Sequence, residues 1–143
     1  MNSKSTNFFS SSVLAGLLAL VFASPLLAED GDSTRGKIVF QQCSICHQIG
    51  PMASNGIGPN LTGVLNRKMG SFTDFSYGTG LEKAAQAGMS WNKEKVFNWL
   101  ADPQGYIRSV VNDESVTTKM TVKISDERAR RDVIEYISTF SNE

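Results

Sequence analysis

A five-residue run, Cys43-Ser44-Ile45-Cys46-His47, constrains the fold of this chain more than any other segment. It is a C-x-x-C-H sequence, the attachment pattern of c-type haem. Two thiols at this spacing can each bond to one vinyl group of a single porphyrin, and the adjacent histidine then lies under the iron. The sequence contains no other cysteine and no other histidine. A chain with this run is expected to fold around one large, flat, mostly apolar group.

Two other functions of the cysteine pair remain open. A thioredoxin-like dithiol occurs near a strand–helix–strand pattern, which this sequence lacks. A structural zinc site takes about four protein ligands, so a carboxylate would have to complete the set here. An exported chain could also join its two cysteines in a disulfide. We favour covalent attachment of one haem c per chain, through Cys43 and Cys46.

Residues 1–28 have the composition of a secretory signal peptide, with a positive charge near the start, an apolar stretch over 13–23 and small residues before the cleavage point. We expect cleavage after Ala28, with Ala23 as the alternative. An uncleaved membrane anchor is also possible. The apolar stretch is short against the ~20 residues of a spanning helix, however, and Ser24-Pro25 interrupts it. The prediction is a periplasmic protein, membrane-anchored only if the signal is retained.

Residues 29–143 have about the length of one small domain. The whole chain has a formal net charge of zero, with 14 basic and 14 acidic residues. Removal of the signal removes Lys4 and no acidic residue, so the mature chain is slightly acidic. A chain of this charge is not expected to bind nucleic acid. A core of this size is marginal on buried area alone, and a covalently held haem would enlarge it.

Four short helices are predicted, and no strand pair. Their expected ranges are 32–42 with Asp32 as cap, 79–87 closed by Gly88, a helix opened by Ser90 or Asn92 that ends near Ala101, and a last helix capped by Ser125. Segment 48–69 is rich in turn-forming dipeptides. Segment 103–124 is interpreted as a long connection, and loops of that length are usually functional or disordered.

The last predicted helix has an apolar face and a charged face. Val133, Tyr136, Ile137 and Phe140 have the spacing of one helix face. The three arginines of this helix are expected on its exposed face, namely Arg128, Arg130 and Arg131.

Because His47 is the only histidine, the second axial position on the iron must go to a methionine, a lysine, a small exogenous ligand or nothing. Met52 is too close to His47 in sequence to cross easily to the other haem face. Met69 and Met89 fit packing or surface positions equally well. Met120 lies far enough along the chain to wrap around the haem.

Residues in a fixed order surround the cysteine–histidine run. They are Gly31-Asp32, Gly36-Lys37, Phe40, Gly58-Pro59-Asn60-Leu61, Asn66-Arg67-Lys68, Phe75-Ser76-Tyr77, Met89-Ser90-Trp91, Trp99-Leu100-Ala101-Asp102-Pro103, Tyr106, Thr118-Lys119-Met120 and the segment 132–136. In this order the chain resembles the class I cytochromes c, especially the mitochondrial and bacterial c2 types, from about residue 31 to residue 143.

The resemblance implies an all-α cytochrome c fold, with short helices and long loops wrapped around one covalently attached haem. The N- and C-terminal helices would cross. At the crossing, Gly36 and Phe40 would pack against Val133 and Tyr136, and the glycine would permit the close approach.

The resemblance also implies the axial ligands of the iron, namely His47 and Met120. Methionine/histidine ligation suits a carrier of high potential. The Pro59 carbonyl would accept a hydrogen bond from the ring nitrogen of His47 that does not bind iron. Trp99 would line the methionine side of the haem, where family members often have a tyrosine.

Further residues would contact the buried haem propionate. The resemblance implies that Tyr77 and Trp91 donate hydrogen bonds to it and that Arg67 lies nearby and offsets its charge. Without the resemblance, aromatic residues such as these would be read as ordinary core residues.

The implied function is electron transfer rather than enzyme catalysis. A monomer would carry single electrons between membrane cytochrome complexes, oxidases, reductases or a photosynthetic reaction centre. The segment from Tyr106 to Met120 is longer than in mitochondrial members, with residues 110–115 resembling an insertion. A mobile loop there would favour an alternative function, a haem enzyme or gas sensor with a labile sixth ligand.

Overall fold

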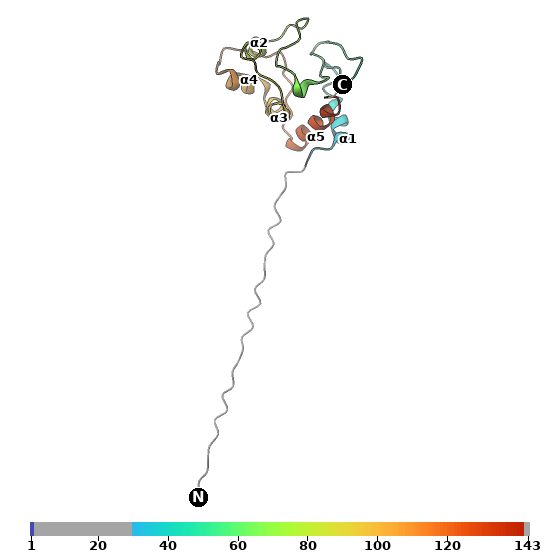
Figure 1. The fold of residues 1–143 in the computed structure, drawn as a ribbon, viewed down its shortest axis with the longest axis vertical. Coiled ribbons are helices and arrows are strands. Elements are labelled where there is room, and N and C mark those ends of the chain that lie inside the picture. The colour runs from blue at the N-terminus through green and yellow to red at the C-terminus, as the bar shows by residue number, and fades with distance from the viewer. Residues whose placement is uncertain (2–29, 142–143) are drawn as a thin grey trace.

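The computed structural model describes residues 30–141 and Met1, so the expected signal peptide lies, Met1 apart, outside the described residues. The elements are α1 (Ser33–Phe40), the 3-10 turn η1 (Val64–Asn66), α2 (Thr79–Gln86), α3 (Lys93–Ala101), α4 (Pro103–Val111) and α5 (Glu127–Ser138). In this part of the chain the β structure is one isolated bridge between Lys68 and Ser90. The all-α prediction is confirmed (Figure 1). None of the helices in residues 30–141 has the length and apolar character needed to cross a membrane.

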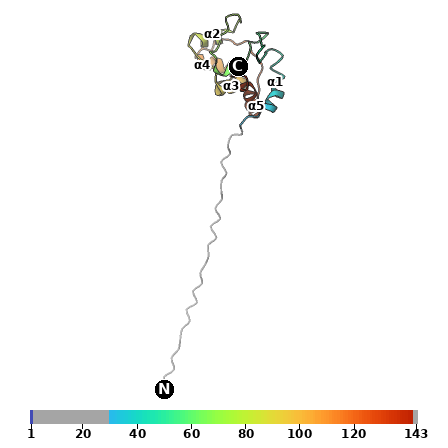
Figure 2. The ribbon, with the colours of Figure 1, turned by 45° about the vertical axis from the view of Figure 1, so that its right-hand side comes forward.

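The first and last helices lie against each other, as Figures 1 and 2 show for α1 and α5. Gly36 is the contact point, because a Cβ atom there would lie 1.9 Å from the carbonyl oxygen of Asp132. One turn further along α1, the ring of Phe40 lies 5.2 Å from that of Tyr136, centroid to centroid. Val133 of α5 is fully buried. The predicted contact of the terminal helices is confirmed.

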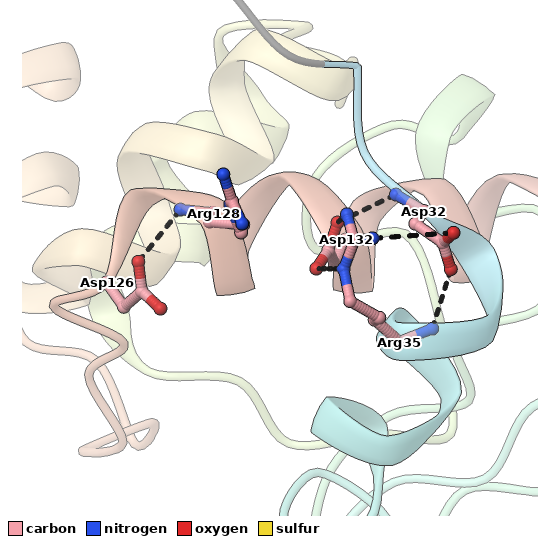
Figure 3. A network of polar contacts seen from close by, with 5 residues as sticks. All are labelled: Asp32, Arg35, Asp126, Arg128 and Asp132. Atoms are coloured by element: carbon pink, nitrogen blue, oxygen red, sulfur yellow. Dashed lines mark hydrogen bonds and ion pairs between the residues drawn. The ribbon is translucent and has the colours of Figure 1, made fainter.

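A buried carboxylate fastens the start of α1 to α5 (Figure 3). Asp132 is 3% exposed and accepts hydrogen bonds from the backbone N–H of Asp32 at 2.7 Å and from Arg35 Nε at 2.7 Å. Arg35 Nη2 donates a further bond of 2.9 Å to Asp132. The Asp32 side chain caps α1 by accepting from the Arg35 N–H at 2.8 Å, as predicted. Asp132 therefore fixes the position of α1 against α5, and the Asp32 carboxylate caps the first turn of α1.

Asp132→Asn should destabilise the protein by about 1–3 kcal/mol at pH 7, the usual range for a buried hydrogen bond to a charged group. Hydrogen bonds from Arg35 hold the pKa of the Asp132 carboxyl below its usual value. A carboxyl with a lowered folded pKa stabilises the fold above its unfolded pKa, ~3.9, and this stabilisation is lost as pH falls through the folded pKa. In urea unfolding, the difference in the free energy of unfolding between variant and parent should therefore be largest at pH 7 and shrink below about pH 4.

Lys93→Ala is the control, since Lys93 and Glu135 form an ion pair of 2.6 Å between α3 and α5 with both side chains more than one-third exposed. Its removal should cost less than about 1 kcal/mol. An Asp132→Asn protein as stable as the parent at pH 7 would contradict the role of this carboxylate.

Helices α2 and α3 agree closely with prediction. Gly88, at φ +70°, follows α2 in the left-handed conformation that glycine adopts easily. Of the two caps considered for α3, Asn92 is the one used, and its side chain accepts from the backbone N–H of Lys95. Helices α3 and α4 are separated only by Asp102, whose backbone is extended.

The prediction of a connection without helix over 103–124 was wrong, because α4 occupies its first nine residues. Pro103 does not only end α3; it occupies the first turn of α4, where its missing N–H costs nothing. Ile107 is fully buried on the inner face of α4, and Asn112 ends the helix with φ 50°. The apparent insertion therefore begins within the last turn of a packed helix.

Two expectations for the last helix were also wrong. Its N-cap is Asp126, not Ser125, and the Asp126 side chain accepts from the backbone N–H of Arg128 at 3.0 Å (Figure 3). Arg130 does not lie on the exposed face but is only 6% exposed. Its guanidinium finds backbone carbonyl acceptors inside the protein, which a pattern of alternating charge does not predict.

Candidate functional site

A cavity with mostly apolar walls lies between the helices and loops and contains about 1310 Å³ of space between the protein atoms, its open mouth included. All nine residues predicted for the site line it, namely Cys43, Cys46, His47, Pro59, Arg67, Tyr77, Trp91, Trp99 and Met120. Core side chains from α3 and α5, such as Leu100 and Val133, complete the walls. The fold thus brings residues almost 80 positions apart to one apolar space.

The cysteines lie in a series of turns that continues from α1. The Ser44 N–H donates to the Phe40 carbonyl at 2.9 Å, and the His47 N–H donates to the Cys43 carbonyl at 2.9 Å. Both thiols are free and partly buried. Burial, with a smaller effect of Cys46, raises the pKa of the Cys43 thiol to about 11. A redox dithiol requires a reactive thiolate, so this environment does not suit a thioredoxin-like function.

One ring nitrogen of His47 is already occupied by the protein. Nδ1 lies 2.7 Å from the Pro59 carbonyl oxygen, which can only accept, so Nδ1 carries the proton and Nε2 is free to bind a metal. Burial lowers the pKa of His47, with the Pro59 bond acting in the opposite direction. A Cβ atom at Gly58 would lie 2.4 Å from Cε1 of this ring. Gly58 and Pro59 therefore hold a neutral, oriented imidazole.

The side chain of Met120 accepts a hydrogen bond that the sequence did not predict. The indole Nε1–H of Trp99 donates to Sδ of Met120 at 3.0 Å. Trp99 is 6% exposed and is itself held edge-on by Trp91 and Tyr106, with ring centroids 5.3 and 6.3 Å away. Trp99 was expected on the methionine side of the haem. Its hydrogen bond to the Met120 sulfur was not predicted, because the spacing of residues in the sequence does not reveal the direction of a side chain.

The other methionines do not line the cavity. Met69 is fully buried in the core, Met89 packs partly buried against it, and Met52 is 93% exposed. Within residues 30–141, no group of three or more His, Cys, Asp and Glu side chains could hold a metal ion, so a zinc site has no ligand set there.

Arg67 and Tyr77 lie along another part of the cavity lining. The Arg67 guanidinium donates to the carbonyls of Asn60 and Thr62 at 2.6 and 2.9 Å and covers the Phe72 ring at 4.2 Å. Burial lowers its pKa and raises the pKa of Tyr77. The phenol keeps its hydrogen at neutral pH, so Tyr77 can donate to an acidic group in the cavity.

Comparison with known proteins identifies the family. Cytochrome c2 iso-1 of Rhodospirillum centenum is 41% identical over 120 residues, which cover 80% of this chain and 100% of that protein. The chain belongs to the class I cytochrome c family. Cytochrome c-551 of Roseobacter denitrificans is 36% identical over 135 residues, covering 90% of this chain and 94% of that one. A search of protein-family models finds no match.

The solved structures agree with this assignment. The structure of cytochrome c2 from Rhodospirillum centenum superimposes with a TM-score of 0.73 at 37% identity, over 78% of this chain and 99% of that one. A class I cytochrome c is an electron carrier with a c-type haem, and the cavity fits that group. It offers apolar walls, two free thiols at the attachment spacing and an imidazole with a free Nε2. The chain carries one haem c, attached through Cys43 and Cys46.

Trp99→Phe should lower the midpoint potential by about 20–60 mV. The indole N–H draws electron density from the Met120 sulfur, which favours the reduced iron if Met120 is its ligand. Loss of a neutral hydrogen bond, about 0.5–1.5 kcal/mol, corresponds to that shift for one electron, at ~59 mV per tenfold change. Potentiometric titration of the holoprotein measures it. Tyr106→Phe, which keeps the ring against Trp99, is the control; equal shifts in both variants would exclude a specific effect of the indole.

Proposed function

We propose that the protein is a periplasmic electron carrier whose haem iron is ligated by His47 and Met120. The observation that carries this proposal is that Nε2 of His47 and the thioether of Met120 belong to the same apolar cavity as the two cysteines. Both ligands are neutral, so the reduced iron carries little excess charge in an apolar site. Such a pair supports a relatively high potential.

The protein's task would be to hold this site unchanged in both oxidation states. The haem iron supplies reversible gain and loss of one electron, and the surrounding residues keep its ligands in place. The Pro59 carbonyl fixes the His47 ring, and the Trp99 indole fixes the Met120 sulfur. Holding both ligands in place would limit reorganisation when the charge changes.

Three cavity residues would hold the buried propionate. Tyr77 and Trp91 each supply a polar hydrogen at the lining, and Arg67 supplies a positive charge whose orientation two backbone carbonyls fix. A carboxylate in an apolar site needs such donors, because an isolated buried charge is costly.

The optical spectrum and midpoint potential of the purified holoprotein test this function together. A methionine–iron charge-transfer band in the oxidised form and a potential well above that of bis-histidine haem proteins are expected. A low potential with no such band would refute the assignment of Met120 and the carrier function that depends on it.

The alternative, a haem enzyme or gas sensor, depended on a mobile segment between Tyr106 and Met120. Helix α4 includes Tyr106, and the segment before Met120 is tied to α2 by the Gly80 N–H, which donates to the Thr117 carbonyl at 3.0 Å. These contacts support a retained ligand. Rapid binding of carbon monoxide by the native ferrous protein at neutral pH would instead favour the alternative.

We expect electron transfer with a membrane cytochrome complex to depend only weakly on salt. The cavity lining includes Gln42, Ile57 and Val122, and the last two are 79% and 41% exposed, so the face a partner would meet has an apolar part. From low to physiological ionic strength, the second-order rate constant should fall by less than the ~10-fold lower limit of strong electrostatic steering. Val122→Lys should make that dependence steeper; a steep dependence in the parent would contradict an apolar docking face.

A further inference from the structure

A buried arginine holds the segment that follows Met120. Arg130, on α5, is 6% exposed, yet its ion pair with Glu127 is long, at 3.8 Å, and the Glu127 side chain is 67% exposed. Its short contacts are to backbone carbonyls: Nη1 donates to Ile124 at 2.7 Å and to Ser125 at 2.9 Å. The Arg130 guanidinium therefore binds mainly the backbone at the end of the loop that follows Met120, and not a carboxylate.

Helix α3 also binds the backbone of Ile124. The Ile124 N–H donates to the Leu100 carbonyl of α3 at 2.8 Å, and Ile124 is 6% exposed. The Arg130 guanidinium also lies over the Phe97 ring of α3, 4.3 Å from its centroid. The Ile124 backbone is thus held through its N–H by α3 and through its carbonyl by α5.

Met120 lies between this anchor and an earlier one. Thr117 is fastened to α2, since its carbonyl accepts from the Gly80 N–H and its own N–H donates to Thr79 Oγ1, both at 3.0 Å. Residues 121–123, between Met120 and Ile124, are exposed. The anchor at Ile124 is therefore the first buried backbone after the sulfur.

We propose that Arg130 is a positioning residue for Met120, and that it sets how often the Met120 sulfur leaves the iron. This inference rests on the proposed ligation by Met120. Without the guanidinium, the buried Ile124 carbonyl loses its charged donor, and an unsatisfied buried acceptor favours opening of the segment. Opening that begins at Ile124 needs no unfolding of α1 or α5, so it can occur in an otherwise native protein.

The test compares Arg130→Met with Arg131→Met in the oxidised holoprotein at neutral pH. Arg131 lies over the same Phe97 ring at 4.9 Å and pairs with exposed Glu127 at 3.1 Å, whereas the carbonyls of 124 and 125 accept from Arg130. The rate of imidazole binding at saturating imidazole reports opening of the segment. It should rise roughly tenfold or more in Arg130→Met, and stay within about twofold of the parent in Arg131→Met.

Hydrogen exchange of the Ile124 amide is the second readout, because it does not depend on the haem ligand. It should accelerate in Arg130→Met and not in Arg131→Met. Arg130→Lys keeps the positive charge but has fewer hydrogen-bond donors, in a different geometry. In both measurements its rate should lie between those of the parent and Arg130→Met. It also provides a milder variant if Arg130→Met does not fold.

Asp132→Asn is the control that distinguishes the effect of Arg130 on the loop from a general loss of stability. It weakens the α1–α5 crossing without touching the loop, so it should leave imidazole binding unchanged. Equal rates in the Arg130 and Arg131 variants, or equal acceleration by Asp132→Asn, would overturn the inference. A parent protein without the methionine–iron band would refute the ligand assignment instead, and the Ile124 amide would still decide whether Arg130 holds the loop.

Discussion

Met120→Ala should abolish the methionine–iron charge-transfer band and lower the midpoint potential by on the order of 0.2 V, within the ~0.8 V range that axial ligands span. The thioether is a weak donor that favours the reduced iron, and an alanine leaves that position to water or a stronger ligand. Of the methionines in residues 30–141, only Met120 lines the cavity. The oxidised spectrum and a potentiometric titration measure both effects.

Met52→Ala is the matched control, since Met52 is 93% exposed. Its spectrum and potential should equal those of the parent. If Met120→Ala retained the band, a different residue would have to be the sixth ligand, and the Trp99 contact would have only a packing role.

Gly36→Ala should destabilise the holoprotein by about 3 kcal/mol or more, at or above the upper end of the usual cost of overpacking. The added Cβ would lie 1.9 Å from the Asp132 carbonyl oxygen and 2.8 Å from Cβ of Tyr136. Backbone cannot move aside as a flexible side chain does, so α1 and α5 must separate. That separation also weakens the Phe40–Tyr136 contact and the hydrogen bonds to Asp132. Urea unfolding followed by helical circular dichroism measures the loss.

Lys37→Ala, one residue further along α1 and exposed, is the control for this substitution. It should leave the free energy of unfolding within about 0.5 kcal/mol of the parent. A Gly36→Ala protein of parental stability would mean that the two helices tolerate a wider separation than their contact suggests.

The sequence predicted the parts of the fold that local chemistry determines. Asp32 and Asn92 are side-chain caps and Gly88 ends a helix, and each of these has a distinct local signature. The close crossing at Gly36 was implied only by the resemblance to the cytochrome c family. The C-x-x-C-H run and the order of residues around it placed nine side chains, and all nine line one cavity.

The errors came from residues whose role depends on tertiary contacts. Pro103 can end one helix or begin another, and the packing of Ile107 decides between them. Arg130 looks like a surface cation until the carbonyls of a distant loop supply its acceptors. Trp99 lines the cavity, but its bond to the Met120 sulfur depends on the direction of the side chain, which the spacing of residues in the sequence does not reveal.

The crossing of α1 and α5 also determines when this domain can fold. Gly36 and Phe40 of the first helix find their partners on the last one, about a hundred residues later. A nascent chain therefore lacks the α5 partners of Gly36 and Phe40 until α5 has left the ribosome, and such long-range contacts form slowly. The growing polypeptide should therefore lack the α1–α5 crossing throughout translation and complete its fold only after synthesis has ended.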